Sequence, residues 1–333
     1  MKPSRTVAVG TGMRIAYERY GDEGHPPLLM VHGFGVQLTA WNPDLLTMLV
    51  DRGLQLIVFD NRDVGISTHL DEAGPIDMVA LMTGRLTTAP YLLSDMADDA
   101  AGLLDALGFE SAHVLGVSLG GMIAQSLAIQ HPDRVRSLTS IMSTPAPGVG
   151  AATPAAGQVL LAPPATNREG AIERSLGIAA VIGSPAYPRD EAWIRESVGI
   201  AWDRNHDPVG VGRQLAAIRL SPDRRPALGE LGMPVLVVHG EADPLIQVDG
   251  GRETAAAIPG AELLVVPGMG HDIPRALWET VVDAVVALVH RAEPVARPPV
   301  PQPAENRYPE THKHARWGRL LDSKGNSPGG DTA

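Results

Sequence analysis

The sequence has no cysteine among its 333 residues. Disulfide bonds, thiolate metal sites and cysteine nucleophiles are therefore all excluded. Aromatic residues are also scarce, at 4% of the chain, while hydrophobic residues together make up 44%. A chain of this length and composition can bury a large core and is typical of a soluble α/β protein.

Long apolar runs and an excess of basic residues are missing as well. No apolar run reaches the roughly 18 residues of a membrane-spanning helix, so we expect no integral membrane segment. The first ten residues lack the apolar stretch of a signal peptide, and both absences favour a cytoplasmic location. The formal net charge is −11. An acidic surface argues against nucleic acid as a partner.

Short apolar segments of strand character alternate with helical segments along most of the chain. A hairpin is expected at 6–20, and further strands at 28–32, 54–59, 135–142, 234–240 and 262–266, with one more beginning at 113. Helices are expected at 39–51, 94–107, 122–129, 249–258 and 274–289. This alternation predicts a mostly parallel sheet with helices on both faces.

The alternation stops after residue 144. Between 145 and 225 no segment has clear strand character, and helical spacing occurs at 168–181, 191–202 and 209–220. We therefore divide the chain into a first core part (1–144), a helical cap (145–225), a second core part (226–292) and a C-terminal tail (293–333). The tail is rich in proline and polar residues, and we expect it to be disordered.

A Gly-x-Ser-x-Gly motif at 116–120 lies between an expected strand and an expected helix. A serine on such a turn adopts a strained conformation that exposes its hydroxyl at the end of the strand. The glycines on either side let strand and helix approach closely. Ser118 is therefore the candidate nucleophile, and the alternative is a glycine-rich turn with a solvated serine.

Two further residues could activate this serine. A serine hydroxyl needs a base to take its proton, and His271 lies on the loop after the last expected strand. The base needs an acid to fix its tautomer, and Asp243 follows the strand at 234–240. The rival acids are Glu241, inside the same turn, and Asp272, whose adjacency to the base hinders contact with its ring. The structural alternatives are a solvated loop histidine and a turn-forming aspartate.

The reaction of such a serine also needs N–H donors for the oxyanion. The usual donors are the backbone amide after the nucleophile and one from an early strand–helix loop. These positions correspond to Leu119 and Phe34. Backbone donors have no side-chain signature, so this assignment rests on position. Neither a metal nor a cofactor is required by this chemistry.

In combination and order, these motifs resemble the α/β-hydrolase fold family over residues 6–292. The matching segments are His-Gly-Phe-Gly at 32–35, Asp-Asn-Arg-Asp-Val-Gly-Ile-Ser at 60–67, the serine motif at 116–121, Gly-Glu-Ala-Asp-Pro at 240–244 and Gly-Met-Gly-His at 268–271. The second segment is similar to a carboxylesterase branch that includes an anthracycline methylesterase and mycobacterial lipase-like esterases. The resemblance implies an eight-stranded sheet with a helical cap. We expect Arg62 and Asp63 to support loops.

A serine nucleophile excludes the aspartate chemistry of haloalkane dehalogenases and epoxide hydrolases. We therefore expect hydrolysis of carboxylic esters through an acyl-enzyme. Apolar residues at 159–164, with Tyr187, Trp193 and Trp202, favour a small hydrophobic ester, although each can instead pack the cap onto the sheet.

Several alternatives remain open. The same site suits a thioesterase, a phospholipase or a cofactor-free perhydrolase of the haloperoxidase type. A protein of another class, a hydrolase fold that binds a hydrophobic ligand without catalysis, is also open. The basic segment at 315–321 is either a peripheral contact with a membrane surface or part of a tail without function. The oligomeric state is not predicted.

Overall fold

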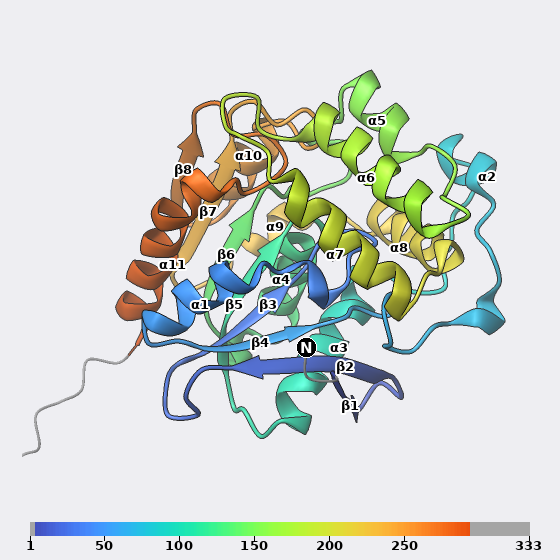
Figure 1. Ribbon diagram of the computed structural model, residues 1–333. Coiled ribbons are helices and arrows are strands. Elements are labelled where there is room, and N and C mark those ends of the chain that lie inside the picture. The colour runs from blue at the N-terminus through green and yellow to red at the C-terminus, as the bar shows by residue number, and fades with distance from the viewer. Residues whose placement is uncertain (1–3, 294–333) are drawn as a thin grey trace, which may run out of the picture. The chain divides into compact units, whose positions relative to one another are not determined.

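The apolar segments form one eight-stranded sheet in the computed structural model, which describes residues 4–293 (Figure 1). The strands are β1 (Arg5–Ala8), β2 (Arg14–Tyr20), β3 (Pro27–Val31), β4 (Gln55–Phe59), β5 (Ala112–Val117), β6 (Val135–Ile141), β7 (Val235–Gly240) and β8 (Glu262–Val266). Their spatial order is β1-β2-β4-β3-β5-β6-β7-β8. Strands β1 and β2 pair antiparallel with each other, β2 pairs antiparallel with β4, and all other pairs are parallel. The predicted mostly parallel sheet is confirmed.

Helices cover both faces of this sheet, as expected. Helices α1 (Pro43–Asp51) and α11 (Trp278–Ala292) pack on one face, while α3 (Leu93–Ala106), α4 (Leu119–Gln130) and α10 (Asp249–Ala257) lie on the other (Figure 1). Successive strand residues point to opposite faces, so Leu28 and Leu29 belong to different buried clusters. The central strands are apolar on both sides because both sides are covered.

Between β6 and β7, a stretch that the structure describes in full, all regular elements are helices. They are α5 (Pro154–Leu160), α6 (Arg168–Ile182), α7 (Glu191–Arg204), α8 (Pro208–Leu220) and α9 (Arg225–Leu228). The helices expected at 168–181, 191–202 and 209–220 correspond to α6, α7 and α8. The division of the chain at 144 and 225 stays a prediction. All of the predicted tail except Glu293 lies outside the described residues.

Some helix boundaries differ from the expectations. The helix expected from 39 begins at Pro43, because the Asn42 side chain accepts a hydrogen bond from the Asp44 amide and caps the first turn. Residues before it form a 3₁₀ turn, η1 (Leu38–Ala40). The remaining short elements are η2 (Asp71–Ala73), α2 (Met78–Met82), η3 (Pro132–Arg134) and η4 (Arg275–Leu277).

Within residues 4–293, no helix is both long enough and apolar enough to cross a membrane.

Candidate active site

Ser118 lies at the sharp turn between β5 and α4, with φ 58° and ψ −119°. This backbone conformation is sparsely populated for a residue with a side chain and costs about 1–3 kcal/mol. The glycines of the motif allow it. A Cβ on Gly116 would lie 2.1 Å from the Gly120 carbonyl oxygen, and one on Gly120 would lie 2.0 Å from the Val31 carbonyl oxygen. The local sequence therefore forces the Ser118 side chain out of the turn.

Ser118, His271 and Asp243 meet at the carboxyl edge of the sheet although they come from three separate loops. His271 Nε2 lies 2.9 Å from Ser118 Oγ, and His271 Nδ1 lies 2.7 Å from Asp243 Oδ2. The Asp243 side chain is fully buried, and its Oδ1 accepts from the Leu245 and Ile246 amides at 2.8 and 3.0 Å. With Nδ1–H donated to the carboxylate, Nε2 is the acceptor for the serine hydroxyl.

The two rival acids lie away from the imidazole. Glu241 is exposed to solvent. Asp272 turns its carboxylate to Ser184, whose amide donates to Oδ1 at 2.8 Å and whose hydroxyl donates to the same oxygen. Asp243 is therefore the acid that contacts His271.

The loop at 32–35 lies directly beside Ser118. A Cβ on Gly33 would be 3.4 Å from Ser118 Cβ. Within residues 4–293, the amides of Phe34 and Leu119 have no hydrogen-bond acceptor, whereas the Gly35 amide donates to Gln214 Oε1 at 3.0 Å. The two amides expected at the oxyanion are thus available to a ligand.

Comparisons with known proteins identify the family to which this fold belongs. The sequence pattern of the α/β hydrolase fold family matches residues 26–274, three quarters of the chain. The chain belongs to this family. A rhodomycin D methylesterase from Streptomyces peucetius is 28% identical over 294 residues, which cover 81% of this chain and 93% of that enzyme.

Solved structures show the same fold in other hydrolases. An esterase from a Rhodococcus species has a TM-score of 0.66 and 22% identity to this α/β hydrolase, over 86% of this chain and 99% of that one. An enol-lactonase from Burkholderia xenovorans has the same TM-score and identity, over 86% and 100%. At these identities the likeness establishes the fold alone.

The first residue of the loop beside Ser118 is a histidine without its usual basicity. The His32 ring lies 4.5 Å from the Trp41 ring, and its Nδ1 accepts from the Gly33 amide at 2.7 Å. Burial lowers the pKa of His32 from 6.5 to about 4. The imidazole is therefore neutral at pH 7 and adds no charge to this loop.

This pKa predicts an acid-sensitive stability for the hydrolase. Between pH 6.5 and about 4 the unfolded chain binds more protons at His32 than the folded chain does, so the free energy of unfolding decreases as the pH falls. We expect the protonation of His32 in the unfolded chain to lower the free energy of unfolding by about 2 kcal/mol between pH 7 and pH 5. Urea denaturation of wild type and His32→Gln at the two pH values measures it. His25→Gln, at an exposed histidine, is the control. If His32→Gln loses as much unfolding free energy between pH 7 and pH 5 as wild type does, the assignment to His32 is wrong.

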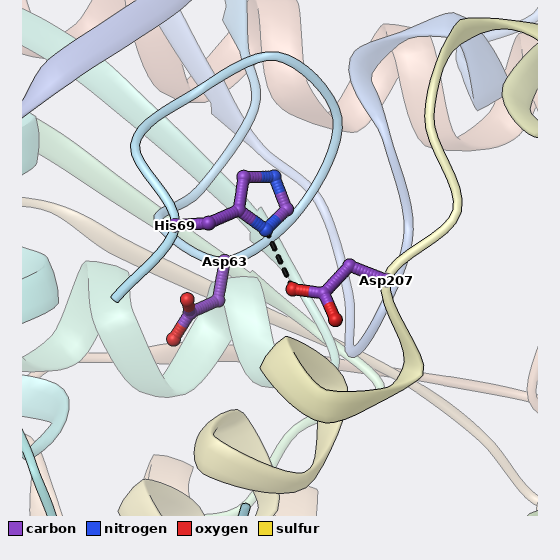
Figure 2. A group of neighbouring side chains, drawn as sticks. All are labelled: Asp63, His69 and Asp207. Atoms are coloured by element: carbon purple, nitrogen blue, oxygen red, sulfur yellow. Dashed lines mark hydrogen bonds and ion pairs between the residues drawn. The ribbon is translucent and has the colours of Figure 1, made fainter. Parts of the chain in front are cut away.

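A second cluster of ionisable side chains lies between the loop after β4 and the start of α8. Asp63, His69 and Asp207 each place one donor atom within 4.8 Å of the others. Figure 2 shows the Asp207 carboxylate facing the His69 ring, while the Asp63 carboxylate points to the other side. From the sequence we expect Asp63 to support a loop, but the sequence gives no signal for His69 or Asp207, and Asp207 is far from the other two along the chain.

The oxygen and nitrogen atoms of this cluster that could bind a metal already have partners in the protein. Both Asp63 oxygens accept from the Arg213 guanidinium, at 2.8 and 2.9 Å, and Arg213 also lies 3.6 Å from Asp207. Burial lowers the pKa of His69, but hydrogen bonds to the Gly65 carbonyl and to Asp207 outweigh it and raise the pKa above its usual value. His69 Nδ1 lies 2.6 Å from Asp207 Oδ2 and Nε2 lies 3.0 Å from the Gly65 carbonyl oxygen, so both ring nitrogens face oxygen acceptors, and the neighbouring guanidinium repels a cation. The cluster is an ion-pair network, not a metal centre.

The expected loop supports are present. Arg62 Nε donates to Asp99 Oδ2 at 2.6 Å on α3, and the Tyr91 hydroxyl donates to Asp63 Oδ2 at 2.7 Å. Asp63 itself has a φ of 67°, so the loop is locally strained and needs these partners.

The aromatic residues expected near the substrate make contacts of their own. The Tyr187 hydroxyl donates to the Pro267 carbonyl at 3.1 Å. The Trp202 ring lies 4.0 Å from the His206 ring. Trp193 lies in the first turn of α7 and is half-buried. Tyr187 and Trp202 therefore have structural contacts within the protein.

Proposed function

We propose that this α/β hydrolase cleaves carboxylic esters through a covalent acyl-enzyme on Ser118. The observation that carries the proposal is the hydrogen-bonded series Ser118 Oγ, His271 and Asp243, with the serine on a strained turn. A nucleophile, a base and a buried acid in this order form the minimum set for acyl transfer.

The proposed cycle has two halves. In the first, His271 takes the hydroxyl proton as Ser118 Oγ attacks the carbonyl carbon, and the amides of Phe34 and Leu119 stabilise the oxyanion. His271 then gives the proton to the leaving alcohol, which departs and leaves the acyl-enzyme. In the second half, His271 takes a proton from a water molecule, which attacks the acyl carbon. The proton then passes to Ser118 Oγ, and the free acid leaves. Asp243 orients the imidazole and stabilises the imidazolium that forms.

A small hydrophobic ester is the proposed substrate. Two curated relatives are named rhodomycin D methylesterases, and an esterase is among the solved structures that share the fold. These names support an ester bond as the target. The apolar cap residues favour an apolar group on one side of that bond. The cytoplasmic location remains a prediction that cell fractionation would test.

The proposal is tested by assaying the full chain against p-nitrophenyl esters of increasing acyl length and against methyl esters of aromatic acids. We expect hydrolysis of both kinds, with a length profile that reports the size of the acyl site. Turnover of thioesters alone, or peracid formation from acetate and peroxide alone, would replace ester hydrolysis by one of those activities. No turnover with any of these would favour a ligand-binding role.

A further inference from the structure

The loop that carries His271 is attached to the helical segment between β6 and β7 as well as to the core. We call residues 267–272 the histidine loop and residues 182–187, at the end of α6, the cap strap. The His271 amide donates to the Ile182 carbonyl at 2.7 Å. On the core side, the Ala242 amide donates to the Met269 carbonyl at 3.0 Å. The backbone of the base is thus held by α6.

Two side chains complete this attachment, Ser184 on the cap strap and Asp272 on the histidine loop. Asp272 Oδ1 accepts from both the amide and the hydroxyl of Ser184. The Ser184 oxygen in turn accepts from the Gly270 amide at 2.9 Å. Ser184 therefore bonds to the residues on both sides of His271.

The two segments approach as closely as backbone allows. A Cβ on Gly270 would lie 2.5 Å from the Gly183 carbonyl oxygen. Gly268 has a φ of 69°, and a Cβ there would lie 2.4 Å from Ala186 Cβ. No side chain fits at either position, so the cap strap fixes the path of the histidine loop and not only its end.

From these contacts we infer that Ser184 and Asp272 are positioning residues, which hold the His271 imidazole between Ser118 and Asp243. This inference rests on the proposed function of Ser118. The physical reason is geometric, because a displacement of about 1 Å in a catalytic group can cost about 100-fold in rate. The position of α6 against the core then determines whether His271 is correctly oriented for catalysis.

The role of Asp272 is one of geometry and not of charge. An asparagine at 272 keeps an oxygen that accepts from the Ser184 amide and hydroxyl, but it removes the negative charge beside His271. An alanine removes both. We expect Asp272→Asn to retain most of the turnover and Asp272→Ala to lose it, whereas a carboxylate acting through its field would make both variants equally slow.

The experiment measures kcat and KM for a p-nitrophenyl ester with six variants: Asp272→Ala, Asp272→Asn, Ser184→Ala, Ser184→Thr, the double variant Asp272→Ala with Ser184→Ala, and Ser118→Ala. Asp272→Ala and Ser184→Ala are expected to lower kcat by about 10- to 100-fold with little change in KM. Threonine at 184 keeps a hydroxyl and should restore turnover. The double alanine variant should be no slower than the worse single variant, because both act through one network.

Asp203→Ala is the matched control. It removes an exposed aspartate that pairs with Arg168 between α6 and α7, away from the histidine loop. We expect this variant to keep wild-type kcat and KM. Melting curves of all variants identify any that are partly unfolded at the assay temperature. The rate at which a fluorophosphonate labels Ser118 reports how well His271 activates the serine in the folded protein.

Three results overturn the inference in distinguishable ways. If Ser118→Ala abolishes turnover while Asp272→Ala and Ser184→Ala keep wild-type kcat and labelling rate, the positioning role is wrong and the proposed function stands. If Asp272→Asn is as slow as Asp272→Ala, the geometric role is wrong. If Ser118→Ala keeps full turnover, the proposed function itself fails.

Discussion

Replacing Ser118 by alanine is expected to lower ester turnover by about 10⁶-fold, the loss seen when a triad nucleophile is removed. Alanine has no oxygen to attack the carbonyl, so no acyl-enzyme forms. The oxyanion amides at Phe34 and Leu119 remain, and they leave a small residual rate above that of water. Steady-state kinetics with a p-nitrophenyl ester measures the change.

The fold of this variant should not change, because alanine and serine meet the same backbone strain at φ 58°. Ser126→Ala is the matched control. It makes the same substitution within α4, where the buried Ser126 hydroxyl donates to the Met122 carbonyl. We expect wild-type turnover from Ser126→Ala, and comparable turnover from both variants would mean that Ser118 is not the nucleophile.

Replacing Arg213 by methionine is expected to destabilise the protein by about 3–5 kcal/mol, the usual cost of removing one partner from a buried ion pair. The Arg213 and Asp63 side chains are both fully buried and share two hydrogen bonds. Without the guanidinium, the Tyr91 hydroxyl and the Leu70 amide are the hydrogen-bond donors that residues 4–293 still offer the Asp63 carboxylate. Urea denaturation at pH 7 measures the change in the free energy of unfolding.

The double variant Arg213→Met with Asp63→Asn tests this cause. It removes the unpaired charge, so we expect it to recover part of the lost stability. Arg195→Met, at an exposed pair with Glu173, serves as control and should cost at most about 1 kcal/mol. If Arg213→Met is as stable as the control, the buried pair does not stabilise the loop after β4.

The sequence predicted the strands and long helices because burial dictates their pattern. The residues of β3 and β4 are buried throughout, and apart from Gln55 at the start of β4 both strands read as continuous apolar runs. Helices α2 and α5 were not predicted, since two turns or fewer carry no apolar periodicity. Their starts are fixed by single caps, the Asp77 side chain on the Ala80 amide and the Thr153 side chain on the Ala156 amide.

The candidate site was predictable to the extent that its chemistry has a local signature. Ser118, Asp243 and His271 each follow a strand in a recognisable loop, and the parallel sheet brings such loops to one edge. Contacts formed by ordinary residues far apart in the chain have no such signature. The pair of Ser184 with Asp272 spans 88 positions and that of Asp63 with Arg213 spans 150. A charged or hydroxyl-bearing residue in the sequence does not show which residue it contacts in the fold.

The most direct test of the central claim is the site of covalent labelling by a fluorophosphonate, read by intact mass and peptide mapping. The account predicts one phosphonyl group per chain, attached to Ser118, and much slower labelling in His271→Ala because the base is lost. An adduct on another residue, or no adduct in a protein that hydrolyses esters, would contradict the assignment of Ser118 as the nucleophile.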